Sequence, residues 1–252
     1  MDEARLSLFA VPGLPEIRPG DDLAALVLDR LAGDGALEDG DILVFAQKVV
    51  SKAEGRIVEL AAVAPSIPAQ ALAEQTGKDP RIVELILSES RRIVRARIGV
   101  IIAEHRLGPI MANAGIDQSN SGGDERAVLL PLDPDASAAR LRDAIRQRCG
   151  RAVGVVISDS FGRPWRLGTC GVAIGAAGVA ALVDRRGAPD REGRPLVATS
   201  IGHADEIAAA ASLVMGQADE GRPVVVVRGL GGAGPETPAA ALVRSAGEDL
   251  FR

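Results

Sequence analysis

Two segments of the chain are almost continuously apolar, which is typical of strands buried on both faces. They are residues 152–160 (AVGVVISDS) and residues 222–229 (RPVVVVRG). Shorter apolar segments rich in β-branched residues predict further strands. These segments are 5–11, 41–51, 96–105 and 127–131, and the second of them can also be interpreted as a strand followed by a turn.

Apolar residues at intervals of three and four predict helices between these strands. Aspartate at the start and glycine at the end strengthen the prediction for 21–33 and 133–150. The other predicted helices are 69–77, 80–94, 203–216 and a final helix within 235–252. The segment 108–125 is dominated by Gly, Asn, Ser and Asp, and we expect a loop there. The strand at 152–160 is followed by a glycine-rich segment, 161–178. The loose alternation of helices and strands predicts a mixed α and β fold.

Composition narrows the class of protein. The chain has 252 residues, a length that is enough for one large domain or two small ones. Hydrophobic residues make up 47% and charged residues 25%, which is ordinary for a globular protein. The net charge of −5 and the lack of basic stretches with interleaved aromatic residues argue against nucleic-acid binding. Two distant cysteines, a first segment unlike a signal peptide and no long apolar run predict a cytoplasmic protein that neither contains disulfides nor spans a membrane.

Two loops offer carboxylates for a hard cation such as Mg²⁺ or Mn²⁺. Asp117 and Asn120 lie in the loop after a predicted strand, where an ordinary turn is the alternative. Ser158, Asp159 and Ser160 end the most apolar strand, and the carboxyl end of a strand is where α/β enzymes often contact ligands. A strand-ending turn or a helix cap explains the same residues equally well.

Four basic residues are candidates for contacts with phosphate. Arg163 and Arg166 follow the strand that ends at Asp159, and arginine binds phosphate through paired hydrogen bonds. Lys48 and Lys52 flank a predicted turn and could neutralise a nucleotide phosphate. For all four, a solvated surface charge is the alternative.

The sequence from Gly229 to Gly234 matches G-x-G-x-x-G after a predicted strand. A dinucleotide-binding fold needs a helix, a second parallel strand and an acidic residue about 20 positions later. Only 18 residues follow Gly234, so we interpret this segment as a glycine turn and reject a dinucleotide-dependent oxidoreductase. The chain also lacks a P-loop, an HExxH motif and a G-x-S-x-G motif.

Six segments together resemble the coenzyme F420-0:L-glutamate ligase family, also called F420:γ-glutamyl ligases. They occur in family order over almost the whole chain. The segments are GLPEIRPGDDLA (13–24), GDILVFAQKVVSKAEGRIVEL (40–60), NAGIDQSN (113–120), LLPLDPDASAARLR (129–142), VGVVISDSFGRPWRLGTCGVAIGAAGV (153–179) and ADEIAAAASLVMGQADEGRPVVVVRGL (204–230).

The resemblance implies a reaction in coenzyme F420 biosynthesis. GTP phosphorylates the lactyl-phospho carboxylate of the deazaflavin F420-0, and the amine of L-glutamate attacks the acyl phosphate. Further glutamates can follow through γ-linkages. Mn²⁺ or Mg²⁺, with K⁺ as a further cation, would assist such a step, which needs positioning more than a protein nucleophile. A non-catalytic guanine-nucleotide- or phosphate-binding paralogue is the alternative.

The resemblance also assigns roles to residues. As metal ligands it implies Asp117 and Asp159, with Ser160 and Gln217 at a second metal. Some family members carry Glu at position 217, so Gln217 would hold that metal with one negative charge fewer. As guanine-nucleotide contacts it implies Leu14, Pro15, Glu16, Ile17, Gln47, Lys48, Lys52, Asn120, Met215, Gly216, Gln217, Ala218, Asp219, Glu220, Gly221 and Arg222.

Substrate contacts and assembly complete the expectations. Arg163 and Arg166 are candidates for the deazaflavin phosphate, and Trp165 for stacking on the deazaflavin ring, with core packing as its alternative. Family resemblance implies an unusual α+β fold in an intertwined homodimer. It also implies one ligase domain over residues 1–252, without the C-terminal nitroreductase-like domain of some bacterial members.

Overall fold

The computed structural model of the chain describes residues 5–31, 33–119, 123, 125–231 and 234–249. Within these residues the helices are α1 (Leu23–Arg30), α2 (Gln47–Ala53), α3 (Ile67–Thr76), α4 (Pro80–Ser88), α5 (Pro134–Cys149) and α6 (His203–Met215). The strands are β1 (Ser7–Ala10), β2 (Ile42–Ala46), β3 (Ile57–Glu59), β4 (Ser90–Arg97), β5 (Val100–His105), β6 (Ile110–Ala112), β7 (Arg126–Val128), β8 (Gly154–Arg163), β9 (Arg166–Ala177), β10 (Val183–Asp184), β11 (Ser200–Ile201) and β12 (Val224–Arg228). The chain therefore has the predicted mixture of helices and several sheets.

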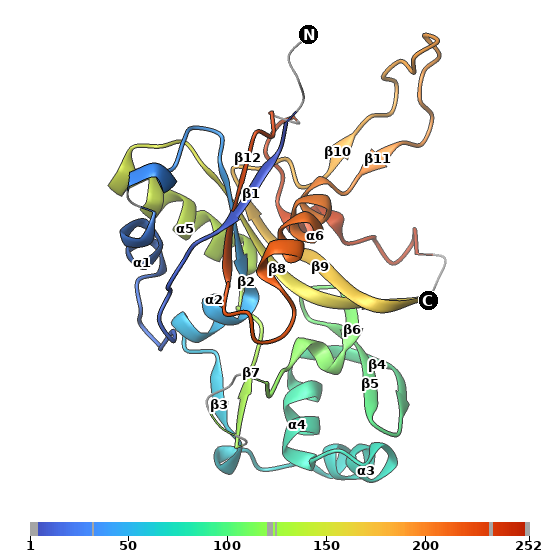
Figure 1. Ribbon diagram of the computed structural model, residues 1–252. Helices are drawn as coiled ribbons and strands as arrows, with labels where there is room; N and C mark the ends of the chain where they lie inside the picture. Colours follow the sequence, from blue (N-terminus) through green and yellow to red (C-terminus); the bar gives the residue numbers. More distant parts are fainter. Residues whose placement is uncertain (1–4, 32, 120–122, 124, 232–233, 250–252) are drawn as a thin grey trace.

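A five-stranded sheet in the order β1-β12-β2-β8-β9 forms the centre of the molecule (Figure 1). Strands β2 and β8 are parallel, and the other neighbours are antiparallel. In β12, Val224 and Val226 face the cluster that includes α1 and α5, while Val225 and Val227 face the cluster under α6. Because side chains alternate between two buried faces, the whole strand is apolar.

A second lobe joins the three-stranded sheet β4-β5-β6 to α3 and α4 around its own apolar core. A partly buried ion cluster holds this lobe to the segment after α2: Arg56 Nη2 donates to Glu89 Oε1 at 2.8 Å, and Arg106 Nε donates to Glu89 Oε2 at 3.0 Å. His105 Nε2 lies 3.4 Å from Glu89 Oε2, too poorly aligned for a strong hydrogen bond. Burial disfavours the ionised Glu89, but His105, Arg56 and Arg106 outweigh it and lower the pKa from 4.5 to about 2.

Several sequence predictions are confirmed, and others are wrong. The helices at 133–150 and 203–216 and the strands at 152–160 and 222–229 are present as α5, α6, β8 and β12. The predicted helix 80–94 ends at Ser88. Its last residues belong to β4, and the single strand expected at 96–105 is the β4–β5 hairpin, which turns at Gly99 with φ +82°.

Three further expectations are corrected. Residues 47–51 begin the helix α2 rather than a strand or turn. The glycine-rich segment 161–178 is mostly the long strand β9, and β6 occupies part of the expected loop 108–125. In the described part of the C-terminal segment, the 3-10 helix Ala239–Leu242 stands where a final helix was expected.

The glycine-rich segment after β12 does not belong to a dinucleotide-binding fold. Strand β12 is antiparallel to both of its neighbours, β1 and β2, whereas the dinucleotide-binding unit needs parallel strands. This confirms the rejection of that motif. None of the helices in the described part of the chain combines the length and apolar composition that crossing a bilayer requires.

Candidate functional site

A cavity of about 580 Å³ opens where β2 ends beside the middle of β8. The parallel register pairs Ala46, the last residue of β2, with Ser158, so the start of helix α2 lies beside residues 158–160 of β8. The lining residues are Leu14, Pro15, Glu16, Ile17, Ala46, Gln47, Lys48, Val49, Lys52, Ser158, Asp159, Ser160, Gly171, Ser212 and the segment 215–223. The cavity thus brings together every described residue that was predicted to contact nucleotide.

Helix α2 supplies the polar floor of the cavity. This helix begins directly after β2, and three of its polar side chains line the cavity: Gln47, Lys48 and Lys52. Gln47 Nε2 donates to Ser51 Oγ at 2.6 Å and to Leu129 O at 3.3 Å, which holds this buried amide in place. The Lys52 side chain is only 8% exposed, and its ammonium forms an ion pair with the exposed carboxylate of Glu16. A buried ammonium with one exposed partner is available to an anionic ligand.

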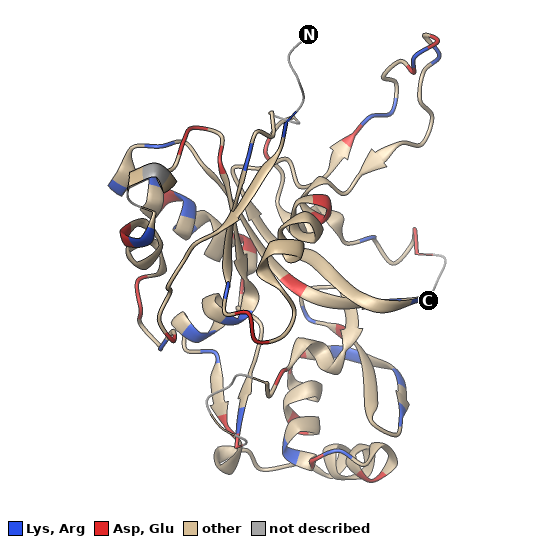
Figure 2. Ribbon diagram, in the orientation of Figure 1, with Lys and Arg blue, Asp and Glu red and all other residues tan. Residues whose placement is uncertain are grey.

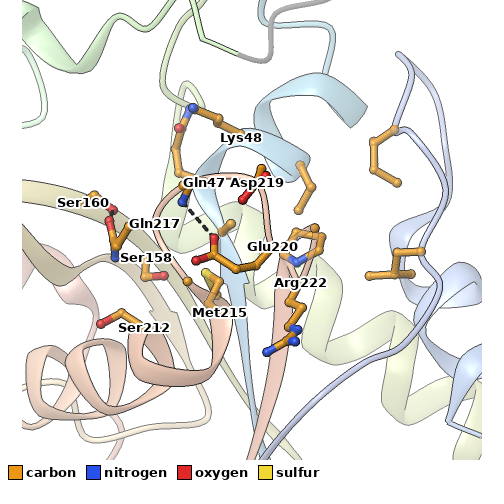
Figure 3. A pocket seen from close by; sticks show the side chains of 18 of the residues that line it. Gln47, Lys48, Ser158, Ser160, Ser212, Met215, Gln217, Asp219, Glu220 and Arg222 are labelled. Carbon is orange, nitrogen blue, oxygen red and sulfur yellow. Dashed lines mark hydrogen bonds between the residues drawn. The ribbon is translucent and has the colours of Figure 1, made fainter.

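The segment between α6 and β12 forms the opposite wall (Figure 3). Ser160 Oγ donates to Gln217 Oε1 at 2.6 Å, which ties this segment to β8. Ala218 N donates to Glu220 Oε2 at 2.8 Å, and the backbone N–H of Ala218 is the main reason that the pKa of Glu220 is lowered. Gly216 has φ +80°, a backbone conformation that residues with a side chain rarely adopt, so glycine is favoured at this position.

Asp159 lines the cavity from β8, and Asp117, which does not line it, lies close enough for its charge to act on Asp159. Asp159 accepts a hydrogen bond from Ser160 N at 2.8 Å. Desolvation, with a smaller contribution from the negative charge of Asp117, raises the pKa of Asp159 to about 6, although the hydrogen bond from Ser160 N and the charge of Lys48 oppose the shift. For Asp117, burial alone would raise the pKa, but hydrogen bonds from Lys48 and Ser119 lower it below its ordinary value.

The loop that carries Asp117 is fastened to α2. Lys48 Nζ lies 2.7 Å from Asp117 Oδ2 and donates to Ser119 Oγ at 2.7 Å. Ser119 donates from its N to Asp117 Oδ1 at 2.6 Å and from its Oγ to Oδ2 at 3.0 Å. Sequence reasoning missed Ser119, whose only signal is its position two residues after an aspartate in a turn. Asn120, also predicted to contact nucleotide, lies outside the described residues.

The donor set fits a hard divalent cation. A desolvated carboxylate, a second carboxylate within electrostatic reach and the nearby oxygens of Ser160 and Gln217 are the ligand types that Mg²⁺ and Mn²⁺ prefer. Across the described residues no group of three or more His, Cys, Asp or Glu side chains is arranged to hold a metal ion. Two carboxylates completed by neutral oxygens and substrate phosphate would suit such a cation better than an all-protein cage. The cation itself stays a prediction.

The predicted substrate-binding arginines lie elsewhere. Arg163 and Arg166 pair with each other at the tip of the β8–β9 hairpin, where Figure 2 shows a basic end to the extended arm. Both are exposed and neither lines the cavity. Trp165, between them, is 90% exposed, so the interpretation of this residue as core packing is wrong for the single chain.

Comparisons with known proteins agree on one family. Residues 13–229 match the family model described as F420-0:Gamma-glutamyl ligase. The chain is 49% identical over 252 residues to the Coenzyme F420:L-glutamate ligase of Methanopyrus kandleri, covering 98% of each chain. It is 50% identical over 225 residues to the protein of that name from Methanothermobacter thermautotrophicus, covering 89% of each chain. The corresponding protein of Archaeoglobus fulgidus is 44% identical over 249 residues, covering 98% of this chain and 97% of its own.

Proposed function

This chain belongs to the F420-0:gamma-glutamyl ligase family, and on that premise we propose that it joins L-glutamate to coenzyme F420-0 at the expense of GTP. The observation that carries the proposal is the cavity between the end of β2 and the middle of β8. Its volume is about 580 Å³, and it is lined by Lys48, Lys52, the desolvated carboxylate of Asp159 and the segment between α6 and β12. The reaction is an acid–amino-acid ligation in coenzyme F420 biosynthesis.

The proposed chemistry has two steps. The lactyl carboxylate of F420-0 attacks the γ-phosphorus of GTP, which forms an acyl phosphate and releases GDP. The amine of L-glutamate then attacks the acyl carbon, forms the amide, loses a proton and releases phosphate. Repetition at the γ-carboxylate of the added glutamate would give γ-linked products. No protein nucleophile is required, because positioning and charge neutralisation lower the barrier.

The residues of the cavity divide this work. The segment Leu14–Ile17 and the segment Met215–Arg222 hold the guanine nucleotide from opposite walls, with Lys52 on a phosphate. Lys48 brings a second positive charge beside Asp117. Mn²⁺ or Mg²⁺ bound by Asp117 and Asp159, with a second ion near Ser160 and Gln217 and K⁺ as a further cation, would neutralise charge on the phosphate oxygens.

We also propose that the chain acts as a homodimer with intertwined arms. The β10–β11 hairpin and the distal end of the β8–β9 hairpin extend beyond the other strands of the central sheet (Figure 1). Trp165, Leu167 and Val197 on these hairpins are 90%, 99% and 86% exposed. Large apolar side chains exposed on extended hairpins favour burial against another surface. Arg163 and Arg166 at the same tip would then contact the deazaflavin phosphate at the interface.

The mass of the product tests the function. The purified protein is incubated with F420-0, L-glutamate, GTP and Mn²⁺, and the deazaflavin is followed by mass spectrometry. We expect a gain of one or more glutamyl units that is lost when GTP or the metal is omitted. An unchanged mass with GTP binding retained would indicate the alternative, a non-catalytic guanine-nucleotide-binding paralogue.

A further inference from the structure

Ser119 closes a ring with Lys48 and Asp117 at the edge of the cavity. Its backbone N–H and its hydroxyl bind one oxygen each of the Asp117 carboxylate, at 2.6 and 3.0 Å. The same hydroxyl oxygen accepts a hydrogen bond from Lys48 Nζ at 2.7 Å, and that ammonium also lies 2.7 Å from Asp117 Oδ2. A single serine therefore contacts both charged groups of the ring.

This ring fixes the orientation of a carboxylate that would otherwise turn freely. Asp117 lies on a loop, and rotation about its terminal torsion is soft. Donors on both oxygens restrict that rotation, and the bond from Lys48 anchors the loop to helix α2, 71 residues away in the sequence. The backbone of Asp117 pairs with a strand only through an isolated bridge to Val128. The side-chain contacts of the ring therefore add to the fixation of Asp117.

The ring also determines where the Lys48 ammonium lies. Lysine has a long flexible side chain, and holding it in one place costs conformational entropy. The hydroxyl of Ser119 and the carboxylate of Asp117 together hold the ammonium close enough to Asp159 for its positive charge to act on that carboxylate. Without the hydroxyl, Lys48 keeps only its ion pair with a partly exposed carboxylate, which is a weak restraint.

We infer that Ser119 is a positioning residue, which fixes the carboxylate of Asp117 and the ammonium of Lys48 for a divalent cation and a phosphate. This inference rests on the proposed function, in which Asp117 binds the cation. Partners that orient a metal ligand typically change metal affinity by roughly tenfold to a hundredfold when they are removed. Ser119 itself is exposed, so the loss of its hydroxyl leaves no cavity in the core.

Binding of Mn²⁺ to the nucleotide-free protein tests the inference without relying on turnover. Free Mn²⁺ is measured by electron paramagnetic resonance in titrations of the wild type, Ser119→Ala and Ser119→Thr. Ser245→Ala is the matched control, because Ser245 Oγ also donates to a carboxylate, that of Glu248 at 2.7 Å, outside the cavity. We expect Ser119→Ala to weaken Mn²⁺ binding roughly tenfold to a hundredfold. Ser119→Thr, which keeps both donors, and the control should bind like the wild type.

The remaining outcomes separate this inference from the proposed function. Asp117→Asn is titrated in parallel. If Asp117→Asn loses Mn²⁺ binding while Ser119→Ala binds like the wild type, the positioning role is wrong and the metal assignment stands. If the wild type binds no Mn²⁺, or Asp117→Asn binds it unchanged, the metal assignment fails and this inference fails with it. A loss in Ser119→Ala that Ser119→Thr does not restore also contradicts the hydroxyl's role.

Discussion

Replacement of Gly171 by alanine tests how the central sheet positions the cavity. Gly171 lies on β9 directly under α6, opposite Ser160. A Cβ at this position would lie 2.3 Å from Ala208 O and 2.8 Å from Ala208 C, whereas ordinary contact begins at 3.4 Å. The obstacle is helix backbone, so no side-chain rotation relieves it. Helix α6 must move away by about 1 Å, the difference between these contact distances.

Such overpacking costs about 1–3 kcal/mol. For a chain of this size, each kcal/mol lowers Tm by roughly 2–4 °C, so we expect Tm to fall by about 2–12 °C. Because α6 leads into the segment Met215–Arg222, the displacement should also raise KM for GTP. Thermal unfolding followed by circular dichroism measures the first effect, and steady-state kinetics measures the second.

Gly162→Ala is the matched control for this change. Gly162 lies on the same hairpin, and a Cβ there would meet nothing within 4 Å. We expect its Tm to stay close to that of the wild type. If the two variants show the same Tm, the close packing of α6 on β9 is not what limits residue 171, and the reasoning is refuted.

Three further changes probe the site and the second lobe. Asp159→Ala should abolish ligation and leave Tm unchanged, measured by product mass and thermal unfolding, because it removes a proposed metal ligand. Lys52→Ala should raise KM for GTP by roughly 10–100-fold, as expected for the loss of a charged hydrogen bond, and change KM for glutamate less. The pKa of Glu89 is about 2 in the folded protein, compared with the ordinary value of 4.5. The ionised carboxylate therefore adds up to about 3 kcal/mol to the free energy of unfolding above pH 4.5, and this contribution is lost as the pH falls towards 2. Glu89→Gln should therefore be less stable at pH 7 in denaturant titrations, with a flatter dependence on pH between 5 and 2.

A specific outcome would contradict each of these three expectations. Wild-type turnover of Asp159→Ala in saturating metal would remove Asp159 from the metal site. An equal or larger effect of Lys52→Ala on KM for glutamate would contradict its phosphate role. An unchanged acid dependence in Glu89→Gln would mean that other carboxylates cause the loss of stability.

The sequence predicted elements well where hydrophobic pattern and capping agree. Asp133 and Gly150 flank α5, and the side chain of Asp133 accepts from Ala136 N. The prediction failed where tertiary contacts decide. The glycine-rich segment that forms β9 was not predicted as a strand. Its residues are small because α5 and α6 approach so closely: a Cβ on Gly175 would lie 2.3 Å from Pro134 O. Composition alone does not reveal that constraint.

The sequence identified several residues of the candidate site but not how they are arranged in space. Asp117, Asp159 and Lys48 were separate candidates, each with an ordinary alternative. Only the parallel pairing of β2 with β8 and the attachment of the Asp117 loop to α2 bring them together. Ser119 has no chemical signal of its own, because its role comes from two contacts that depend on that attachment.

Transfer of oxygen from substrate to phosphate tests the proposed ligation most directly. F420-0 is prepared with ¹⁸O in its lactyl carboxylate and is incubated with the protein, GTP, Mn²⁺ and L-glutamate. If the carboxylate attacks the γ-phosphorus, one ¹⁸O atom appears in the inorganic phosphate for each amide formed. Amide formation with unlabelled phosphate, or phosphate release without amide, would contradict the account.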